Sequence, residues 1–528
     1  MYRHATMKFT LLTFLAWSIS CSELLPRYEF APTLAVSPTA IQFVDATGRV
    51  LDTDLAIEVQ FVGPGSSEVV NARGGFRFDI IGATLQFGLD PDSAPSRQEP
   101  VEFSLVARAN GYLTAVETFR ITSREDSEMR IIRLISIDTP PPGVSIAQAS
   151  LATDPSGALV EDLVVGTTPT SSADEQVVLT MSSGTRFFDA DGAQMSGPMD
   201  VTLVHFDSET RESLISYPGG LSPNRVLDSD GNILPDMNFV TAGFVELLVE
   251  QEGRKASTFS VPLTIESELS PTVVNPTTGN PVQVGDSVDI FSLDEATGEW
   301  TQESQVLIYG APSGKPSVSF EIPHLSYWNI DWGTERCESG VTIEVLQNTC
   351  SCQCARLIDA STQQVIKEEI LCFDECDGSN GVISEFTLQN APEDTDVIFE
   401  IDYPYSTCDT PMPLYTTEPF DACEGSPEQV VMLVVGIETV EVRVAGSCGF
   451  GRLLPTLHLW HRRQAGSPWQ PLGLVEEGVL VASGLERGVN YEFLAWFDSR
   501  TYVFEASIQD DIEFELDLPP ELCDAVEP

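Results

Sequence analysis

Cysteine is the residue type that could carry the most chemistry in this 528-residue chain, and its eleven copies fall into two groups. One, Cys21, stands alone near the N-terminus. The other ten lie in the last third of the chain: Cys337, Cys350, Cys352, Cys354, Cys372, Cys376, Cys408, Cys423, Cys448 and Cys523. A dense set of thiols could bind a soft metal, but an even set in an exported chain is typical of disulfides. We therefore predict up to five disulfides and leave their pairing open.

Cys21 directly follows a segment that is typical of a secretory signal. Basic residues precede an apolar run from Phe9 to Trp17, which is shorter than the ~20 residues of a membrane-spanning helix. With the cysteine placed after Ser20, residues 1–20 resemble the signal peptide of a bacterial lipoprotein. The resemblance implies that Cys21 becomes the first mature residue, carries the lipid and holds the protein on a membrane. The alternative is an ordinary signal-peptide cysteine with cleavage nearby.

The residue after Cys21 is Ser22 rather than the aspartate that keeps many lipoproteins in the inner membrane. By the same resemblance we expect the outer membrane or cell surface of a Gram-negative bacterium. The acidic balance fits an exterior location, because 80 acidic residues face 27 basic ones and give a net charge of −53. Such a surface repels nucleic acid, so no nucleic-acid partner is expected. The simpler interpretation of the charge is that it keeps an exported surface soluble.

Histidine chemistry is sparse after the signal segment, where only His205, His324, His458 and His461 remain. The sequence has neither a Gly-x-Ser-x-Gly elbow nor a His-Glu-x-x-His helix. His458 and His461 could ligate zinc, but in a strand they face opposite sides. His205 and His324 are interpreted as structural. We predict that the protein is not an enzyme, and an unrecognised hydrolase remains the least favoured hypothesis.

A second candidate for metal binding is the acidic segment that contains Asp228, Asp230, Asn232 and Asp236. Its side-chain oxygens recur at alternating positions, as in calcium loops, although the trailing glutamate of an EF-hand is missing. An Asp-Gly turn between two strands uses the same residues without a metal and is the favoured interpretation. No cofactor is expected, and calcium is the alternative.

The elements that must position these residues are predicted to be strands. Apolar Ile57, Val59 and Phe61 alternate with polar neighbours, and similar short runs recur between Gly, Asn and Asp turns, which favours antiparallel sandwiches. The predicted fold is all-β: tandem immunoglobulin-like or fibronectin type III-like β-sandwiches in a row, disulfide-rich in the C-terminal third. The expected units are a signal (1–20), a tether (21–32), a first sandwich (33–139), a large β-domain (146–335), a cysteine-rich β-domain (336–435) and a C-terminal β-domain (436–528). Residues 147–175 are small and polar and are expected to be loosely ordered.

The large β-domain carries ordered, widely spaced motifs: GPMDVTL at 197–203, YPGGL at 217–221, DEATGEW at 294–300 and HLSYWN at 324–329. Together they resemble the extracellular β-domain shared by cartilage intermediate layer protein, astroprincin-type membrane proteins and related bacterial surface lipoproteins. The likeness covers about residues 180–332. It implies a non-enzymatic extracellular module and brings no catalytic residues.

The C-terminal domain contains Leu485, Gly488 and Tyr491 at offsets that resemble the tyrosine corner of fibronectin type III domains. Trp460 is then expected to be the core tryptophan of this domain. Cys448 and Cys523 depart from the family pattern, because those domains generally lack a disulfide.

These features favour a non-catalytic, lipid-anchored surface protein that presents its sandwiches for adhesion or recognition of an extracellular protein or glycan. A glycan-capturing accessory lipoprotein is the alternative, and it requires tryptophans exposed along one face. The candidates are Trp300, Trp328, Trp332, Trp469 and Trp496, for which a core position is the default.

Overall fold

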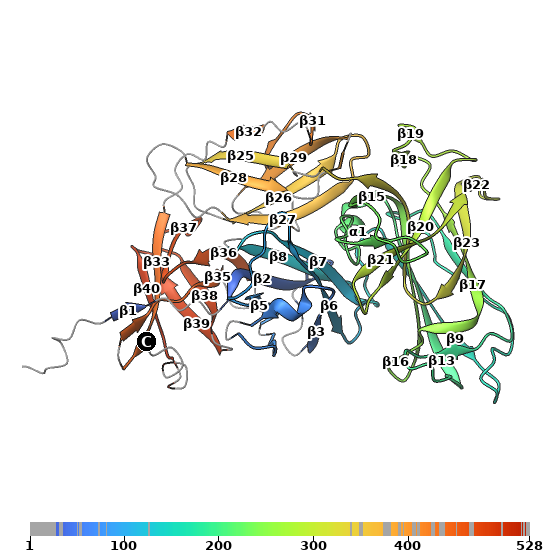
Figure 1. Ribbon diagram of the computed structural model, residues 1–528, viewed down its shortest axis with the longest axis horizontal. Helices are drawn as coiled ribbons and strands as arrows, with labels where there is room; N and C mark the ends of the chain where they lie inside the picture. The colour runs from blue at the N-terminus through green and yellow to red at the C-terminus, as the bar shows by residue number, and fades with distance from the viewer. Residues whose placement is uncertain are drawn as a thin grey trace, which may run out of the picture.

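The computed structural model confirms the predicted fold class, because the chain is nearly all β (Figure 1). Among the described residues, helical structure is limited to short pieces such as α1 (Arg211–Leu214) and the 3₁₀ turn Ser66–Glu68. No helix in the described ranges is long and apolar enough to cross a membrane. The structure describes residues 28–30, 35–49, 51, 55–71, 74–80, 82–124, 127–337, 341–347, 352–372, 382–388, 392–393, 395–403, 408, 412–423, 428–431, 439–449, 451–463, 469–497, 500–518, 520 and 523.

The first unit is a sandwich of two sheets. One sheet holds β2 (Val36–Asp45), β4 (Val69–Val70), β5 (Thr84–Leu89) and β8 (Glu128–Leu134); the other holds β3 (Ile57–Val62), β6 (Val101–Ala109) and β7 (Ala115–Ile121). Along β3 the apolar residues are half-buried and the polar ones exposed, as the period-two pattern predicts. Between the sheets, the rings of Phe87, Phe103 and Phe119 lie 5.0 to 5.9 Å apart and form the centre of the core.

The second unit is the largest and packs an eight-stranded sheet on a six-stranded one. The eight strands are β9 (Val144–Ala152), β13 (Pro198–Phe206), β14 (Val226–Leu227), β15 (Met237–Gln251), β16 (Arg254–Lys255), β20 (Ser287–Asp294), β21 (Glu299–Leu307) and β24 (Tyr327–Glu335). The six are β10 (Leu163–Gly166), β11 (Val177–Met181), β12 (Phe187–Phe188), β17 (Thr258–Glu268), β22 (Tyr309–Gly310) and β23 (Pro316–His324), with a separate hairpin of β18 (Val274–Asn275) and β19 (Asn280–Pro281).

The expectation that residues 147–175 are loosely ordered is wrong. The end of β9 and the whole of β10 lie in this segment; β9 pairs along its whole length with β13, and β10 pairs with β11. Ala147, Ala149 and Leu163 pack against the core between the two sheets, so small side chains here allow close packing rather than disorder.

The third unit holds the cysteine-rich segment. One sheet contains β25 (Val341–Gln347), β28 (Val382–Leu388) and β32 (Glu428–Val431); the other contains β26 (Cys352–Asp359), β27 (Val365–Cys372), β29 (Asp396–Asp402), β30 (Pro413–Thr416) and β31 (Phe420–Asp421). Strand β27 also meets β8 of the first unit through the pair Ile370 and Met129. The two units therefore share one nine-stranded sheet.

The C-terminal unit is a further sandwich. One sheet contains β33 (Thr439–Cys448), β34 (Gly451–Leu453), β37 (Val479–Ser483) and β40 (Ile512–Leu516); the other contains β35 (Leu457–Arg462), β36 (Gln470–Val475), β38 (Asn490–Phe497) and β39 (Arg500–Ser507). The Tyr491 hydroxyl accepts a hydrogen bond from the backbone N–H of Glu486 at 3.0 Å. The tyrosine corner predicted from the sequence is therefore present.

The segment predicted to be a tether contributes a strand to this last unit. Residues Tyr28–Phe30 form β1, which pairs in parallel with β34 at the edge of the C-terminal sandwich. The prediction that residues 21–32 act only as a tether is therefore wrong for these three positions. A physical reason is that a sheet edge presents unpaired backbone groups, which a passing extended segment can satisfy.

The four units pack against one another and are not separate domains joined by linkers. The first unit lies at the centre, with the second unit, the C-terminal unit and the third unit on three different sides of it (Figure 1). Val62 and Val106 of the first unit share a core with Phe206, Phe244 and Tyr327 of the second. The sandwiches follow one another along the chain as expected, but they do not stand apart in space, because apolar residues on the outer faces of their sheets are buried between units.

Trp460 is part of such an interface, and its predicted role as the core tryptophan of the C-terminal sandwich is wrong. Its side chain is fully buried against Ala40 and Met129 of the first unit, on the outer face of β35. The core of the C-terminal sandwich is built around Leu459, Tyr491 and other residues instead. The sequence does not show on which face of the strand Trp460 lies, because both faces of β35 are buried.

Glu246 is an unusual member of the interface between the first and second units. It lies on β15 and is 1 % exposed, beside the buried hydroxyl of Tyr327. Burial, reinforced by the nearby negative charge of Glu295, raises the pKa of Glu246 to about 8. The side chain is therefore neutral over most of the physiological range.

The pKa of Glu246 is higher in the folded chain than in the unfolded chain. Its contribution to the free energy of unfolding is therefore largest below about pH 4.5 and is lost as the pH rises through 8. The free energy of unfolding of the wild-type protein should fall between pH 6 and pH 9. We expect Glu246→Gln to make this fall smaller by about 2 kcal/mol. Calorimetric melting at the two pH values measures this difference. Equal pH dependence in the two proteins would contradict the assignment.

Candidate functional site

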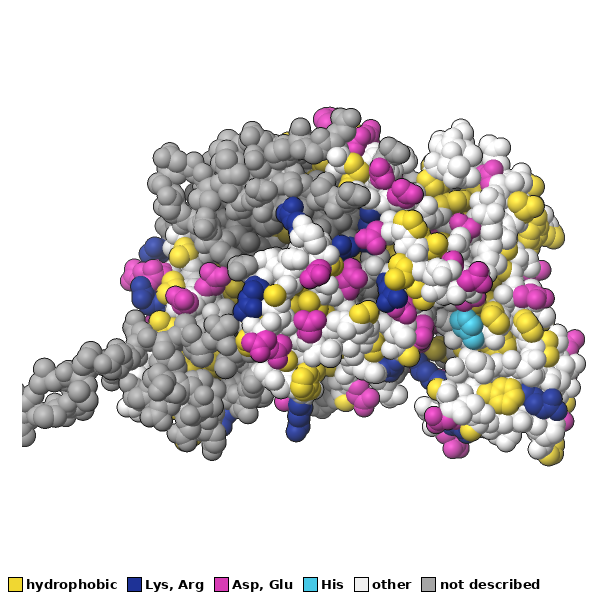
Figure 2. All heavy atoms as spheres, in the orientation of Figure 1, with side chains coloured by type: hydrophobic (Ala, Val, Ile, Leu, Met, Phe, Trp, Pro, Cys, Tyr) yellow, Lys and Arg dark blue, Asp and Glu magenta, His cyan; other side chains and the backbone are white. Residues whose placement is uncertain are grey.

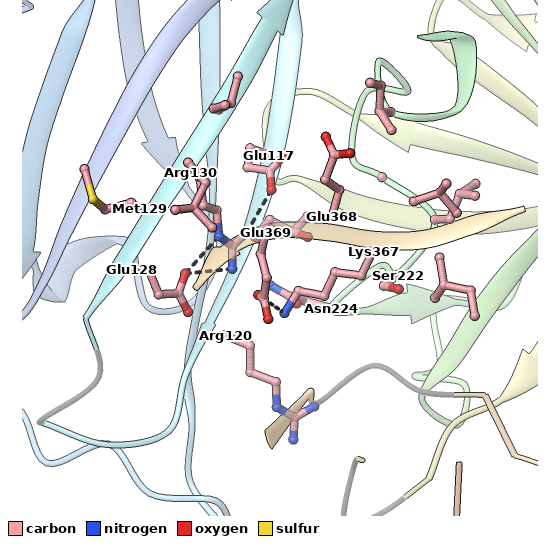
Figure 3. A pocket seen from close by; sticks show the side chains of 18 of the residues that line it. Glu117, Arg120, Glu128, Met129, Arg130, Ser222, Asn224, Lys367, Glu368 and Glu369 are labelled. Carbon is pink, nitrogen blue, oxygen red and sulfur yellow. Dashed lines mark hydrogen bonds and ion pairs between the residues drawn. The ribbon is translucent and has the colours of Figure 1, made fainter. Parts of the chain in front are cut away.

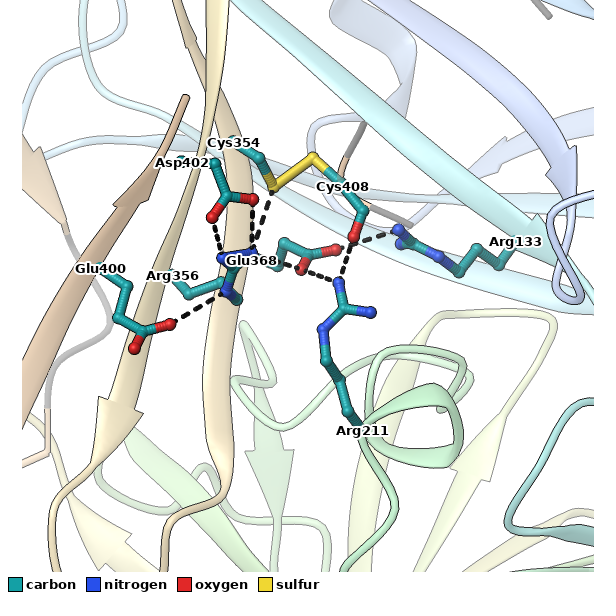
Figure 4. Close-up of a disulfide and its surroundings, with 8 residues drawn as sticks. All are labelled: Arg133, Arg211, Cys354, Arg356, Glu368, Glu400, Asp402 and Cys408. Atoms are coloured by element: carbon teal, nitrogen blue, oxygen red, sulfur yellow. Dashed lines mark hydrogen bonds and ion pairs between the residues drawn. A yellow bond between two sulfur atoms is a disulfide. The ribbon is translucent and has the colours of Figure 1, made fainter. Parts of the chain in front are cut away.

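The most concentrated group of charges in the described structure surrounds Glu368 on β27. One carboxylate oxygen accepts from Arg133 of β8 at 3.0 Å, and the other contacts Arg211 of α1 at 2.5 Å and Arg356 of β26 at 3.8 Å. Figure 4 shows these three arginines converging on the glutamate. One carboxylate therefore joins three units that are far apart in the sequence.

Two of the arginines that contact Glu368 also have other hydrogen-bond partners. The guanidinium of Arg356 forms a two-pronged pair with Asp402, and both side chains are almost fully buried. The disulfide Cys354–Cys408 lies beside this pair, and Arg211 donates a hydrogen bond to the carbonyl oxygen of Cys408 (Figure 4). Arg211 and Arg356 each pair with a carboxylate of β27 or β29, and these contacts tie α1, β26 and β27 to one another.

A cleft of about 460 Å³ opens next to this junction. It lies where β8 and β27 diverge after their one shared residue pair, and it is bounded by β7 and by residues 214–224 that follow α1. A volume of this size is within the range of ligand pockets in proteins. The cleft is the candidate functional site.

Charged side chains dominate the walls of the cleft. Arg130 lies 2.8 Å from both Glu117 and Glu128, and its guanidinium covers the ring of Phe119 at 4.3 Å. The ammonium of Lys367 lies 2.8 Å from Glu369 (Figure 3). The walls therefore offer both donors and acceptors to a polar ligand.

The calcium candidates of the sequence do not converge on one point. Asp228 accepts hydrogen bonds from the backbone N–H groups of Asp230 and Asn232 at 2.9 and 2.8 Å, which is the geometry of a turn. Asp236 instead pairs with Arg120 of the first unit at 2.9 Å. Gly231 supplies the positive φ of 83° that this turn requires.

The histidines lie in structural positions. His458 contacts the carbonyl oxygen of Pro38 at 3.2 Å, in the interface with the first unit, whereas the ring of His461 packs on Tyr491. The two therefore occupy opposite faces of β35. Burial lowers the pKa of His205, of His458 and of His461 to about 4, so these rings are neutral at physiological pH. The fourth, His324, lies 3.1 Å from Glu303 on the second unit.

The tryptophans predicted for a glycan platform are not aligned on a surface. Trp300, Trp328 and Trp332 are buried in the second unit. Trp469 is half-buried with Arg462 over its ring at 4.1 Å, and the side chain of Trp496 lies outside the described residues. The described members of the set therefore belong to packing.

Three disulfides are present in the described part of the chain: Cys337–Cys423, Cys354–Cys408 and Cys448–Cys523, with Cα–Cα distances of 5.4 to 5.5 Å. Cys352 is also in a disulfide and lies opposite Cys372 in the β26–β27 ladder. Cys21, Cys350 and Cys376 lie outside the described residues, as does the side chain of Cys372. Seven of the ten C-terminal cysteines are therefore in disulfides, and their thiols are not free to bind the soft metal that was the alternative.

Sequence reasoning missed Glu368, its three arginines and the cleft. A signal was present, because β27 places Lys367, Glu368 and Glu369 in succession within an otherwise apolar strand. The partners could not be identified, since Arg133 and Glu368 are 235 residues apart.

We expect Glu368→Gln to lower the free energy of unfolding by about 3 kcal/mol or more, because it leaves three partly or fully buried guanidinium groups short of one negative charge. Glu400→Gln is the matched control, since Glu400 pairs with one of these arginines, Arg356 at 3.5 Å, accepts a hydrogen bond from the Thr416 hydroxyl and is more exposed than Glu368. Urea unfolding followed by tryptophan fluorescence measures both variants. Equal midpoints for the two variants would show that Glu368 does not hold the junction.

No protein-family model and no curated protein matches this chain. Among solved structures, the Bacillus anthracis TIE protein is similar at 8 % identity and a TM-score of 0.13, over 88 % of this chain and 75 % of that one. A streptococcal ancillary pilin is similar at 7 % identity and a TM-score of 0.12, over 45 % of this chain and 94 % of that one. At these scores the similarity carries no argument about function.

Proposed function

We propose that this chain is a non-catalytic, lipid-anchored cell-surface protein that presents β-sandwich modules for adhesion to, or recognition of, extracellular partners. The observation that carries the proposal is the oxidised state of its C-terminal cysteines. Disulfides persist in oxidising compartments outside the cytoplasm, and the pairs Cys337–Cys423, Cys354–Cys408 and Cys448–Cys523 join positions 54 to 86 residues apart in the sequence. They agree with the export signal that precedes Cys21.

The placement of titratable groups supports a non-catalytic role. The carboxylates whose pKa burial raises most are Glu246, in the interface between the first and second units, and Asp331, in the second unit; both are buried and neither lines the cleft. His205 and His458 are at most 2 % exposed. A general base must reach its substrate to act, and these side chains are shielded from it.

The position of β1 supports an orientation on the membrane. Tyr28 lies seven positions after Cys21, and an extended chain spans at most about 3.6 Å per residue. A lipid on Cys21 would therefore hold the C-terminal sandwich within about 25 Å of the membrane. The second unit lies at the opposite end of the molecule in Figure 1 and would face outward.

The surface charge supports an exterior role. Acidic side chains are spread over the described surface that Figure 2 shows and do not form one patch. A dispersed negative charge keeps an exported protein soluble and separate from other acidic surfaces. Because Ser22, and not an aspartate, follows Cys21, we propose that the protein lies at the outer membrane or cell surface of a Gram-negative bacterium.

We expect Cys21→Ala to move the protein from the membrane pellet to the soluble fraction, because acyl chains on this thiol provide the attachment, at ~0.8 kcal/mol per buried methylene. Fractionation and immunoblotting measure the distribution. Ser22→Ala is the control and should stay in the pellet. A Cys21→Ala protein that still sediments with membranes would refute lipid anchoring.

We expect mass spectrometry of the mature protein to show a gain of ten hydrogens on reduction, as five disulfides require. Digestion without reduction should yield linked peptides for the three identified pairs. Ten free thiols, or a chain that retains its first twenty residues unmodified, would contradict export.

A further inference from the structure

We propose that the contact between the first and second units is a pH-sensitive switch, which stays closed while Glu246 keeps its proton and opens once this carboxyl ionises. The inference goes beyond the proposed function and does not rest on it. Glu246 is buried on β15, and its neighbours on the same face of the strand, Phe244 and Leu248, pack in the core that the two units share. Its side chain therefore points toward the first unit.

Two polar contacts cross the interface beside Glu246, and both end on Thr114, which precedes β7 of the first unit. The hydroxyl of Tyr327 on β24 donates to the carbonyl oxygen of Thr114 at 2.7 Å. The ammonium of Lys255 on β16 donates to the hydroxyl of Thr114 at 3.2 Å. Tyr327 is also directly opposite Glu246 in the β15–β24 ladder. The donors that hold the first unit therefore lie next to the buried carboxyl.

An ionised Glu246 competes for these two donors. A hydroxyl carries one proton, so Tyr327 serves either the carbonyl oxygen of Thr114 or a carboxylate at position 246, and not both. The positive charge of Lys255 favours the ionised form of Glu246 and is drawn toward it. A neutral carboxyl attracts both donors much less, because hydrogen bonds to a charged acceptor are the stronger ones. Ionisation therefore weakens the contacts that join Thr114 to the second unit.

The remaining charges around Glu246 oppose its ionisation in the closed interface. Burial raises the pKa of this carboxyl most, and the negative charges of Glu295 and Glu250 add to the effect, so that the pKa reaches about 8 against the opposing effect of the two donors. Arg108 of the first unit is the nearby cation on that side, and it pairs with Glu295 at 3.3 Å. The closed interface therefore accommodates the neutral carboxyl better than the ionised one.

The first half of β15 is held independently of Glu246. The side-chain amide of Gln364, from the third unit, binds the backbone of Thr241: its Nε2 donates to the carbonyl oxygen at 2.8 Å, and its Oε1 accepts from the N–H at 3.3 Å. Arg211 of α1 is paired with Glu368 of the third unit. Opening at Glu246 would therefore turn the second unit about these contacts without releasing it.

The size of the effect follows from the pKa of Glu246 in the two states. In the open interface water hydrates the carboxyl and returns its pKa toward the ordinary value of 4.5. The closed form is therefore favoured most below about pH 4.5 and loses this advantage as the pH rises through 8. Between pH 6 and pH 8 the ratio of open to closed molecules should rise about fiftyfold.

The test measures how fast a buried thiol at the interface reacts with a neutral maleimide, in the purified mature protein in detergent. Val204→Cys places the thiol opposite Glu246 in the β13–β15 ladder, on the face toward the first unit. Each rate is divided by that of a free thiol at the same pH, because the thiolate is the reactive form. The normalised rate then reports the fraction of molecules with an open interface.

We expect the normalised rate at Val204→Cys to rise about fiftyfold from pH 6 to pH 8, and to rise less than about threefold when Glu246→Gln is added. Glu250→Gln is the matched control, since Glu250 lies on the same strand but is only half-buried, and it should keep the wild-type rise. Glu246→Leu serves if the amide lowers the melting temperature.

A second thiol separates opening of the interface from unfolding of the whole unit. Val249→Cys lies on the same strand but faces the core between the two sheets of the second unit. At pH 8 it should react at least about tenfold more slowly than Val204→Cys, because opening of the interface leaves that core intact.

Two results overturn the proposal: the rise at Val204→Cys persists in full with Glu246→Gln, or the thiols at positions 204 and 249 react at equal rates at pH 8. The second outcome would mean that the interface is exposed only by unfolding. The assay uses purified protein, so its failure leaves the membrane-anchoring experiments on Cys21 unaffected.

Discussion

The arrangement of this protein depends on one carboxylate that three arginines share. Glu368 belongs to the third unit, Arg133 to the first and Arg211 to the second, so the pairing fixes these three units relative to one another. Each ion is costly to bury alone, and only the assembled junction offers all of them partners at once. The junction therefore favours one arrangement of the units over any in which they separate.

Apolar contacts surround this junction and make it a part of a continuous core. The eight-stranded sheet of the second unit is covered on one face by its own six-stranded sheet and on the other by the first unit. Trp460 and Met129 join the C-terminal and first units in the same way. The buried charges select the arrangement, and the apolar interfaces supply most of the stabilising free energy.

The strands could be predicted from the sequence because their pattern is local. Apolar residues alternate along Ile57 to Phe61, and Tyr491 lies at a fixed offset from Leu485, so neighbours alone carry the signal. The contacts between units could not be predicted in the same way. Trp460 was assigned to the wrong face since both faces of its strand are buried. Strand β1 was missed because its partner, β34, lies more than 400 residues further along the chain.

A candidate binding site could be assessed from the sequence only where its residues are neighbours in the chain. The Asp228 turn was recognised as an alternative to calcium because its hydrogen bonds are local. The cleft is assembled from β7, β8, β27 and the segment after α1, and no spacing rule connects residues so far apart. Its charged pairs become visible only when the fold is known.

Small-angle X-ray scattering of the mature protein at low and high salt tests the central claim, that the buried junction holds the units as one body. Buried pairs are screened much less than exposed ones. The account predicts a radius of gyration that stays unchanged between 0.1 and 1 M salt, at about the value of one compact particle. An increase with salt toward the dimensions of separate, flexibly joined sandwiches would contradict it.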